Sequence, residues 1–288
     1  MARILIVHGI GNTFGGEMEL RGPWYRALCD GLLRVRHDPL PAETDCYCPF
    51  YGDLFRPGAP LGAGREPSAQ DIEAATDDEI RLVESIWRAA AESDPAVPRP
   101  EEYGETLFRS PRLLERALNA LARSQFLADH VPLQFFGDLK QVVHYLNDAG
   151  TRAQILARVL PHIDDGTKVV IGHSLGSVVA YEALCAKKLS GAVAFVTLGS
   201  PLGIRNVVYD KLTPPPSAEG LGFWPPSASS WTNVAARGDI VAAQKELAGL
   251  FGARVTDVLV DSGWRAHDSL RYLNAAQTGA AIARALSQ

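Results

Sequence analysis

The stretch from Val169 to Tyr181 constrains the fold of this chain more than any other. It passes from a β-branched run through Gly-His-Ser-Leu-Gly (172–176) into an apolar, helix-like segment. This order is typical of a buried strand, a very tight turn and a helix. Ser174 would occupy the apex in a strained conformation, which is tolerable because Gly172 and Gly176 let strand and helix approach closely.

The composition is that of a globular chain with a large hydrophobic core. Of its 288 residues, 47% are hydrophobic and 21% are charged, and α/β folds of this length commonly form one domain. We expect a single domain over residues 1–288. The net charge of −5 and the lack of a Lys/Arg cluster argue against nucleic acid as a partner.

The N-terminal sequence runs straight into Ile4–Val7, which is too short for the apolar part of a signal peptide and predicts a cytoplasmic protein. The apolar run 169–186 is interrupted by Gly172, Gly176 and Glu182, so we expect no transmembrane segment there. The four cysteines lack metal-ligand spacing, which favours reduced thiols. No pattern in the sequence indicates an oligomeric state.

Short apolar runs alternate with helical patterns, as expected for a mainly parallel sheet covered on both faces. The predicted strands are 3–7, 45–50, the run that begins at 169, 192–198, 231–236 and 254–260. The predicted helices are 24–35, with Pro23 at its start, 72–91, 113–128, 139–146, 152–160, 241–247 and 269–286.

A Pro- and Gly-rich stretch at 56–65 breaks this alternation. Mainly helical segments follow, and we predict a helical insertion at about 56–135 that forms a cap or lid. Its acidic side chains are more typical of a solvated helix face than of a metal site. They are Asp71, Glu73, Asp77, Asp78 and Glu79.

A serine nucleophile needs a base within hydrogen-bond reach and a third group that orients the base. In α/β-hydrolase topology the chain order is Ser, acid, His, and His267 is the only histidine after Ser174. It follows the last predicted strand, so its imidazole can reach the carboxyl edge of the sheet. We predict that His267 is the base, and that His173 points away from the nucleophile.

Among the eight carboxylates after Ser174, Asp239 has the most suitable position for the acid. It follows the strand 231–236 in a loop where a buried carboxylate can accept the imidazole N–H. Asp210 is the alternative. A purely structural role for Asp239, as the N-cap of the helix at 241–247, is also open.

The carbonyl attacked by a serine develops an oxyanion, which preorganised N–H donors stabilise. We predict that the backbone N–H of Leu175 is one donor and that of Ile10 the second. Gly9 and Gly11 would let the substrate approach this loop. We expect His8 to support the loop rather than to transfer protons.

The segment 212–230 is rich in Pro, Gly and Ser but contains Phe223 and Trp224. Aromatic residues in such a loop often cover a pocket, and we predict substrate contacts for both. The alternative is that they only anchor the loop.

Together, His-Gly-Ile-Gly at 8–11, Gly-His-Ser-Leu-Gly at 172–176 and Gly-Ser-Pro-Leu at 199–202 resemble motifs of the α/β-hydrolase superfamily, closest to its lipase-like serine esterase branch. The resemblance covers residues 3–55 and about 136–288. It implies a mainly parallel sheet flanked by helices, a Ser174–Asp239–His267 triad, and neither metal nor organic cofactor.

The function predicted from these residues is hydrolysis of a carboxylic ester through an acyl-enzyme, with a small-molecule or lipid-like acyl substrate. An acyltransferase, thioesterase or cyclase would use the same triad, and the sequence does not separate them. A non-catalytic binding module with a hydrolase fold is a third possibility.

Overall fold

A computed structural model describes residues 3–56, 68–103, 110–127, 131–263 and 265–287 and contains six strands. They are β1 (Ile4–Val7), β2 (Cys46–Tyr47), β3 (Val169–His173), β4 (Val193–Leu198), β5 (Ala228–Ala236) and β6 (Val255–Val260). All pair in parallel, in the order β2-β1-β3-β4-β5-β6. The predicted parallel α/β sheet is confirmed.

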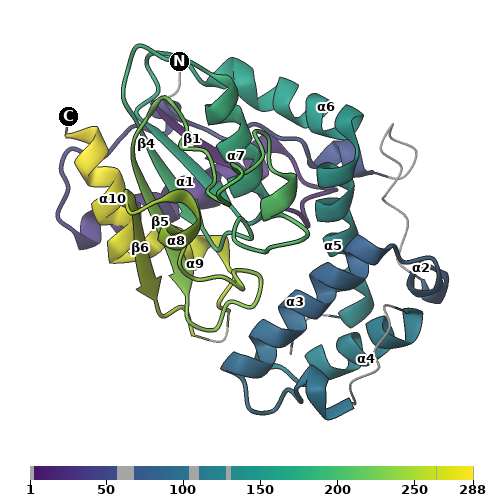
Figure 1. Cartoon of the computed structure of the whole chain (residues 1–288). Helices are drawn as coiled ribbons and strands as arrows, with labels where there is room; N and C mark the ends of the chain where they lie inside the picture. Colours follow the sequence, from purple (N-terminus) through teal and green to yellow (C-terminus); the bar gives the residue numbers. More distant parts are fainter. Residues whose placement is uncertain (1–2, 57–67, 104–109, 128–130, 264, 288) are drawn as a thin grey trace.

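Helices cover both faces of this sheet (Figure 1). They are α1 (Glu17–Arg34), α2 (Ala69–Glu73), α3 (Asp77–Ser93), α4 (Pro111–Leu121), α5 (Pro132–Asn147), α6 (Ala149–Val159), α7 (Leu175–Ala186), α8 (Ala248–Phe251), α9 (Ser269–Asn274) and α10 (Ala276–Leu286). Alternate residues of β1 enter two different cores, because successive side chains of a strand point to opposite faces. Ile4 and Ile6 pack with α1, α9 and α10, whereas Leu5 and Val7 pack on the side of α6 and α7.

The register of the strands brings their carboxyl ends to one edge of the sheet. Val7 pairs with Gly172, and Leu198 pairs with both His173 and Val234. The loops that follow β1, β3, β5 and β6 therefore meet at this edge, which is where parallel sheets place their ligands.

Helices α2, α3 and α4 pack together with the start of α5 beside this edge (Figure 1). Parts of the predicted insertion, 57–67, 104–109 and 128–130, lie outside the described residues. The helix predicted at 72–91 is two helices, because Thr76 starts a new one: its hydroxyl accepts from the Glu79 N–H, and the Glu79 carboxylate accepts from the Thr76 N–H. A lid role for this region stays a prediction.

The first helix differs from its predicted bounds, since α1 begins at Glu17 and continues through Pro23. The helix predicted at 241–247 is absent, because tertiary hydrogen bonds engage the backbone of this segment instead. Asn233 Nδ2 donates to the Lys245 carbonyl at 2.9 Å, and the Leu247 N–H donates to Asp257 Oδ1 at 2.8 Å.

The helix predicted at 269–286 is divided at Ala275, whose backbone is extended. Both halves pack against α1 through glycines. A Cβ on Gly31 would overlap the Leu273 carbonyl oxygen, and one on Gly279 would overlap the Gly31 carbonyl oxygen. The break thus lets α9 and α10 each reach α1 closely.

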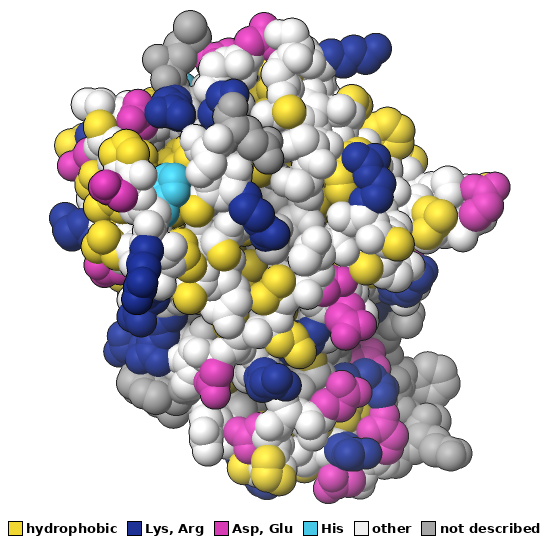
Figure 2. All heavy atoms as spheres, turned by 90° about the vertical axis from the view of Figure 1, so that its left-hand side faces the viewer, with side chains coloured by type: hydrophobic (Ala, Val, Ile, Leu, Met, Phe, Trp, Pro, Cys, Tyr) yellow, Lys and Arg dark blue, Asp and Glu magenta, His cyan; other side chains and the backbone are white. Residues whose placement is uncertain are grey.

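On the face shown in Figure 2, hydrophobic side chains are interspersed with charged side chains of both signs. Across the described ranges, no helix combines the length and the apolar character that crossing a bilayer requires.

We expect Gly279→Ala to destabilise the fold by about 1–3 kcal/mol, because the new methyl group has no space against the α1 backbone. The control is Gly249→Ala in α8, where nothing lies within 4 Å of the added Cβ. In urea unfolding, the control should raise the free energy of unfolding by up to about 1 kcal/mol. Equal effects of both substitutions would contradict this packing.

Candidate active site

The turn between β3 and α7 holds Ser174 in a rare backbone conformation, with φ 53° and ψ −131°. A Cβ on Gly172 would lie 2.5 Å from the Ser177 Cα, and one on Gly176 would overlap the Val7 carbonyl oxygen. Only glycine fits at either position. The predicted strand, tight turn and helix are confirmed.

Hydrogen bonds on both sides of Ser174 fix the turn. Its N–H donates to the Leu198 carbonyl at 3.0 Å, and its carbonyl accepts from the Ser177 N–H at 2.9 Å and hydroxyl at 2.6 Å. The Ser177 hydroxyl also lies 2.6 Å from that of Ser200. Sequence reasoning missed Ser177 and Ser200, although Ser200 belongs to the Gly-Ser-Pro-Leu motif.

The structure brings His267 and Asp239 together from two different loops. His267 Nδ1 lies 2.8 Å from Asp239 Oδ2. Because a carboxylate only accepts, Nδ1 carries the proton and leaves Nε2 able to accept one. Asp210, the alternative acid, is exposed and instead accepts from the Asn206 N–H.

Asp239 is fully buried, and each of its carboxylate oxygens is hydrogen-bonded. Oδ1 accepts from the N–H groups of Val241 at 2.9 Å and Ala242 at 3.2 Å. Oδ2 accepts from the Tyr272 hydroxyl at 2.7 Å in addition to His267. The predicted alternative, an N-cap on a helix, is replaced by a local turn that satisfies the same oxygen.

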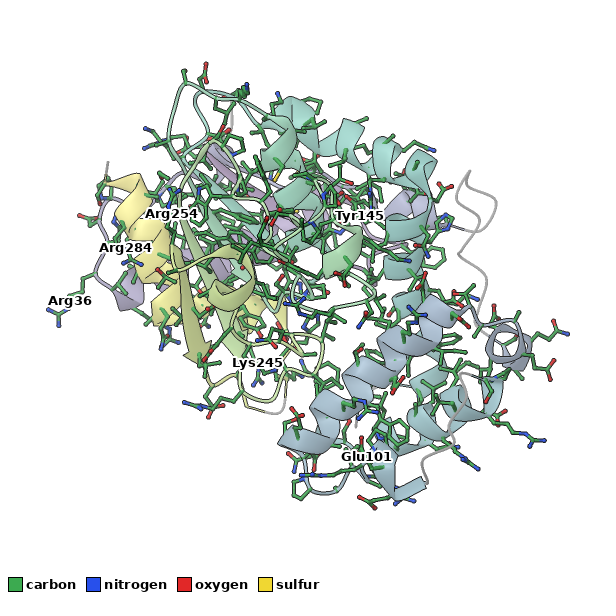
Figure 3. The ribbon with its side chains drawn as sticks, in the orientation of Figure 1. Arg36, Glu101, Tyr145, Lys245, Arg254 and Arg284 are labelled. Atoms are coloured by element: carbon green, nitrogen blue, oxygen red, sulfur yellow. The ribbon has the colours of Figure 1, made fainter. Side chains whose placement is uncertain are left out.

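These contacts keep Asp239 ionised. Burial alone would raise the pKa of Asp239, but the electrostatic interaction and hydrogen bond with the His267 ring, together with Lys245 and Tyr272, lower it to about 2. Figure 3 shows Lys245 in the loop after β5, at the lower end of the strands. Sequence reasoning missed both Lys245 and Tyr272.

His173 contacts the loop that carries His267. Its ring lies 4.7 Å from the His267 ring, and its Nε2 donates to the His267 carbonyl at 2.9 Å. Burial and the neighbouring His267 lower the pKa of His173 to about 3, so the ring is neutral at ordinary pH. His173 thus holds the backbone of the His267 loop.

His8 orients the loop that follows β1. The Tyr51 N–H donates to His8 Nε2 at 3.2 Å, so Nδ1 carries the proton and donates to the Gly9 carbonyl at 2.7 Å. Asn12 Nδ2 also donates to that carbonyl, at 3.2 Å. In a trans peptide, fixing the Gly9 C=O fixes the opposite direction of the Ile10 N–H. Burial lowers the pKa of His8 to about 4, which keeps the ring neutral.

The two predicted donors, Ile10 and Leu175, lie in segments adjoining Ser174. A Cβ on Gly9 would lie 2.7 Å from the Ser174 Cβ and 3.3 Å from its Oγ. Leu175 is the first residue of α7, where the N–H has no partner within the helix. Within the described chain, neither N–H donates to a protein group, so both can serve an anion.

Ser174 and His267 line one cavity of about 860 Å³. In the described residues no hydrogen bond joins the two side chains. Ile10 and Gly11 also line this cavity. Its apolar lining includes residues of α3, of α5 and of the segment before α5: Leu82, Ile86, Phe126, Phe135, Leu139 and Val142. Its charged residues are Glu19, Asp138, Arg265 and Asp268.

Phe223 and Trp224 do not line this cavity. They precede β5 and so lie at the amino edge of the sheet. The Trp224 indole N–H donates to the Ala228 carbonyl at 2.9 Å. The Arg254 guanidinium packs on the Trp224 ring, with its Cζ 4.1 Å from the ring centroid. Figure 3 shows Arg254 and Lys245 at opposite ends of β6. The structure therefore separates these aromatic residues from Ser174. Trp224 anchors the loop, whereas the Phe223 side chain is exposed.

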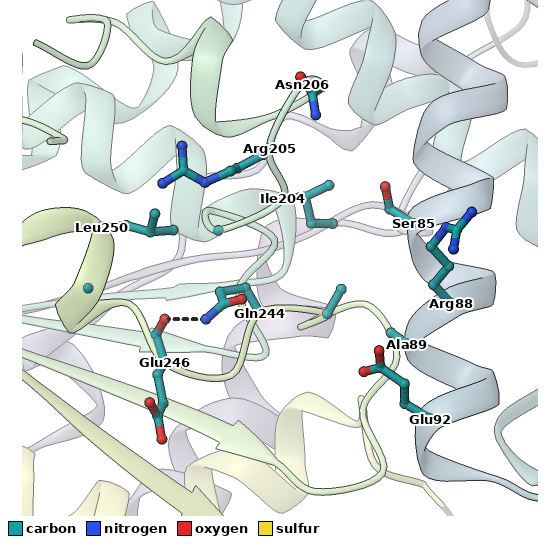
Figure 4. A pocket seen from close by; sticks show the side chains of 13 residues that line it. Ser85, Arg88, Ala89, Glu92, Ile204, Arg205, Asn206, Gln244, Glu246 and Leu250 are labelled. Carbon is teal, nitrogen blue, oxygen red and sulfur yellow. Dashed lines mark hydrogen bonds between the residues drawn. The ribbon is translucent and has the colours of Figure 1, made fainter. Parts of the chain in front are cut away.

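A second hollow of about 570 Å³ lies between α3, the loops 203–206 and 243–246, and α8 (Figure 4). Ile204 borders both hollows. The side chains that line this second hollow are mostly polar and include Arg88, Glu92, Arg205 and Gln244. Ser174 and His267 are not among them.

Comparison with protein-family models, with curated proteins and with solved structures gave no match to this chain. Its function is therefore inferred from the residues and their geometry.

The neutral His173 predicts a pH effect on stability. Its pKa is about 3 in the fold against an ordinary 6.5, so between these values only the unfolded chain binds the proton. Stability contributed by this group falls as pH drops through that window, by about 1.4 kcal/mol per pH unit. Urea unfolding of His173→Gln should show a correspondingly shallower pH dependence than the unaltered protein.

The matched control for His173→Gln is Tyr272→Phe, which removes a buried polar group but no histidine. It should retain the slope of the unaltered protein near about pH 5. An unchanged slope in His173→Gln would mean that His173 is protonated in the folded state.

Proposed function

We propose that this protein is a serine hydrolase that cleaves carboxylic esters through an acyl-enzyme, as its resemblance to α/β-hydrolases implies. One observation carries the proposal: Ser174, held at φ 53°, shares a cavity with a histidine whose Nδ1 is bound by a buried, ionised Asp239. A binding module would not need a strained serine beside an oriented base.

In the proposed reaction, Ser174 Oγ attacks the ester carbonyl carbon while its proton passes to His267 Nε2. The carbonyl π pair moves to oxygen, where the N–H groups of Leu175 and Ile10 stabilise the negative charge. Collapse breaks the bond to the alcohol oxygen, which takes the proton from Nε2. Water then attacks the acyl group by the same steps and releases the acid.

The cavity supports an acyl substrate with an apolar part, since α3 and α5 supply aliphatic and aromatic side chains above Ser174. In the proposed reaction, the hydrogen bond between the Ser174 hydroxyl and His267 forms when substrate binds. Hydrogen bonds between catalytic side chains are often long in the free enzyme and shorten in the substrate complex. A location in the cytoplasm belongs to the same proposal and rests on the sequence alone.

We expect a fluorophosphonate probe to label the protein and Ser174→Ala to abolish both labelling and hydrolysis of p-nitrophenyl esters. The control is Ser269→Ala, since Ser269 lines the same cavity but follows a different strand. It should keep labelling and turnover. Equal labelling of Ser174→Ala and the unaltered protein would refute the proposed nucleophile.

We expect Asp239→Asn to lower kcat by about 10⁴-fold, because an amide that donates to Nδ1 selects the wrong tautomer of His267. Steady-state kinetics with one p-nitrophenyl ester measure the loss. Asp210→Asn is the control and should leave kcat unchanged, since Asp210 is exposed. The opposite ranking would assign the acid to Asp210.

A further inference from the structure

One face of α5 lines the cavity with four residues at helical spacing: Phe135, Asp138, Leu139 and Val142. Three are apolar, as expected for a wall that binds an acyl chain. Asp138 is the exception. It is the seventh residue of α5, too far from the helix start to gain from the helix dipole.

Asp138 has almost no partner within the described chain. Its Oδ1 accepts one long hydrogen bond, 3.4 Å from Gln141 Nε2, and among the described residues Oδ2 makes no hydrogen bond or ion pair. A methyl group on Gly11 would lie 3.7 Å from Oδ2. This oxygen therefore faces the cavity beside the loop that carries the Ile10 N–H.

The fully buried acids among the described residues have partners. Asp71 accepts from Lys140 at 3.1 Å, and Glu182 accepts from the Tyr145 hydroxyl at 2.6 Å. Asp138 has no such group, and burial raises its pKa to about 6. A partly buried carboxyl with only one long hydrogen bond is typical of a functional position.

We propose that Asp138 binds a hydrogen-bond donor on the substrate, a hydroxyl or an ammonium group. The preferred ester is then a polar acyl ester rather than a plain fatty acyl ester, with an apolar part against α3 and α5. This inference rests on the proposed function. Both groups would donate a hydrogen bond to an Asp138 carboxyl oxygen, but only the ammonium group carries a charge.

The test uses p-nitrophenyl esters in which a hydroxyl, an ammonium or a methyl group is moved carbon by carbon along the acyl chain. The unaltered protein should favour one donor-bearing ester over its methyl counterpart by about tenfold or more in kcat/KM, because the methyl ester covers the Asp138 carboxyl without giving it a hydrogen bond. Asp138→Leu should reverse this preference.

Asp138→Asn separates the two donors. Its amide oxygen still accepts from a hydroxyl, so a hydroxyl preference would largely persist, whereas a preference for ammonium would be lost. The matched control is Glu19→Gln, because Glu19 lines the same cavity but is exposed. It should leave both ratios unchanged, and unchanged ratios in Asp138→Leu would overturn the inference.

Two further readouts separate this inference from the proposed function. Calorimetric binding of the same esters to Ser174→Ala measures the preference without turnover, and it should change with Asp138→Leu in that background. Probe labelling without a change in preference would reject the Asp138 subsite alone. A preference without labelling would reject the hydrolase and keep the subsite.

Stability gives an independent check. A partly buried carboxyl with only one long hydrogen bond contributes little to the fold, so Asp138→Leu should raise the urea midpoint or leave it unchanged. A lowered midpoint would show that Asp138 serves the fold, which would contradict a substrate-binding role.

Discussion

Close packing around the Ser174 turn is the constraint on which the rest of the site depends. The strained residue costs about 1–3 kcal/mol, which the surrounding fold must offset. Gly176 packs against the carbonyl oxygens of Val7 and His8, and Gly9 packs against the Ser174 side chain. These contacts join β1, β3 and α7 at one point. They also bring the Ile10 and Leu175 segments beside the hydroxyl that the proposed reaction uses.

Two neutral histidines extend this arrangement outward from the turn. His8 fixes the peptide that presents the Ile10 N–H, and His173 fixes the backbone of His267. Both are buried, both donate to a carbonyl, and burial lowers the pKa of each. Neither needs to transfer a proton. The site thus uses neutral imidazoles to position backbone groups and leaves His267 as the base in the proposed reaction.

Sequence patterns predicted the parts of the molecule that depend on local chemistry. Buried parallel strands read as apolar runs, and the strained turn requires Gly172 and Gly176. Chain order selected His267 and Asp239, which the structure brings to 2.8 Å. Tertiary contacts decided the rest. Asn233 and Asp257 bind backbone groups of the segment 241–247, which forms no helix, and the position of Trp224 before β5 puts it at the sheet edge away from Ser174.

The most direct measurement is a crystal structure of the protein after reaction with a fluorophosphonate. The account predicts a bond from phosphorus to Ser174 Oγ, with one phosphoryl oxygen within hydrogen-bond distance of the N–H groups of Leu175 and Ile10. His267 Nε2 should face the adduct while Nδ1 remains on Asp239. A bond to another residue, or a phosphoryl oxygen turned away from both N–H groups, would contradict the proposed site.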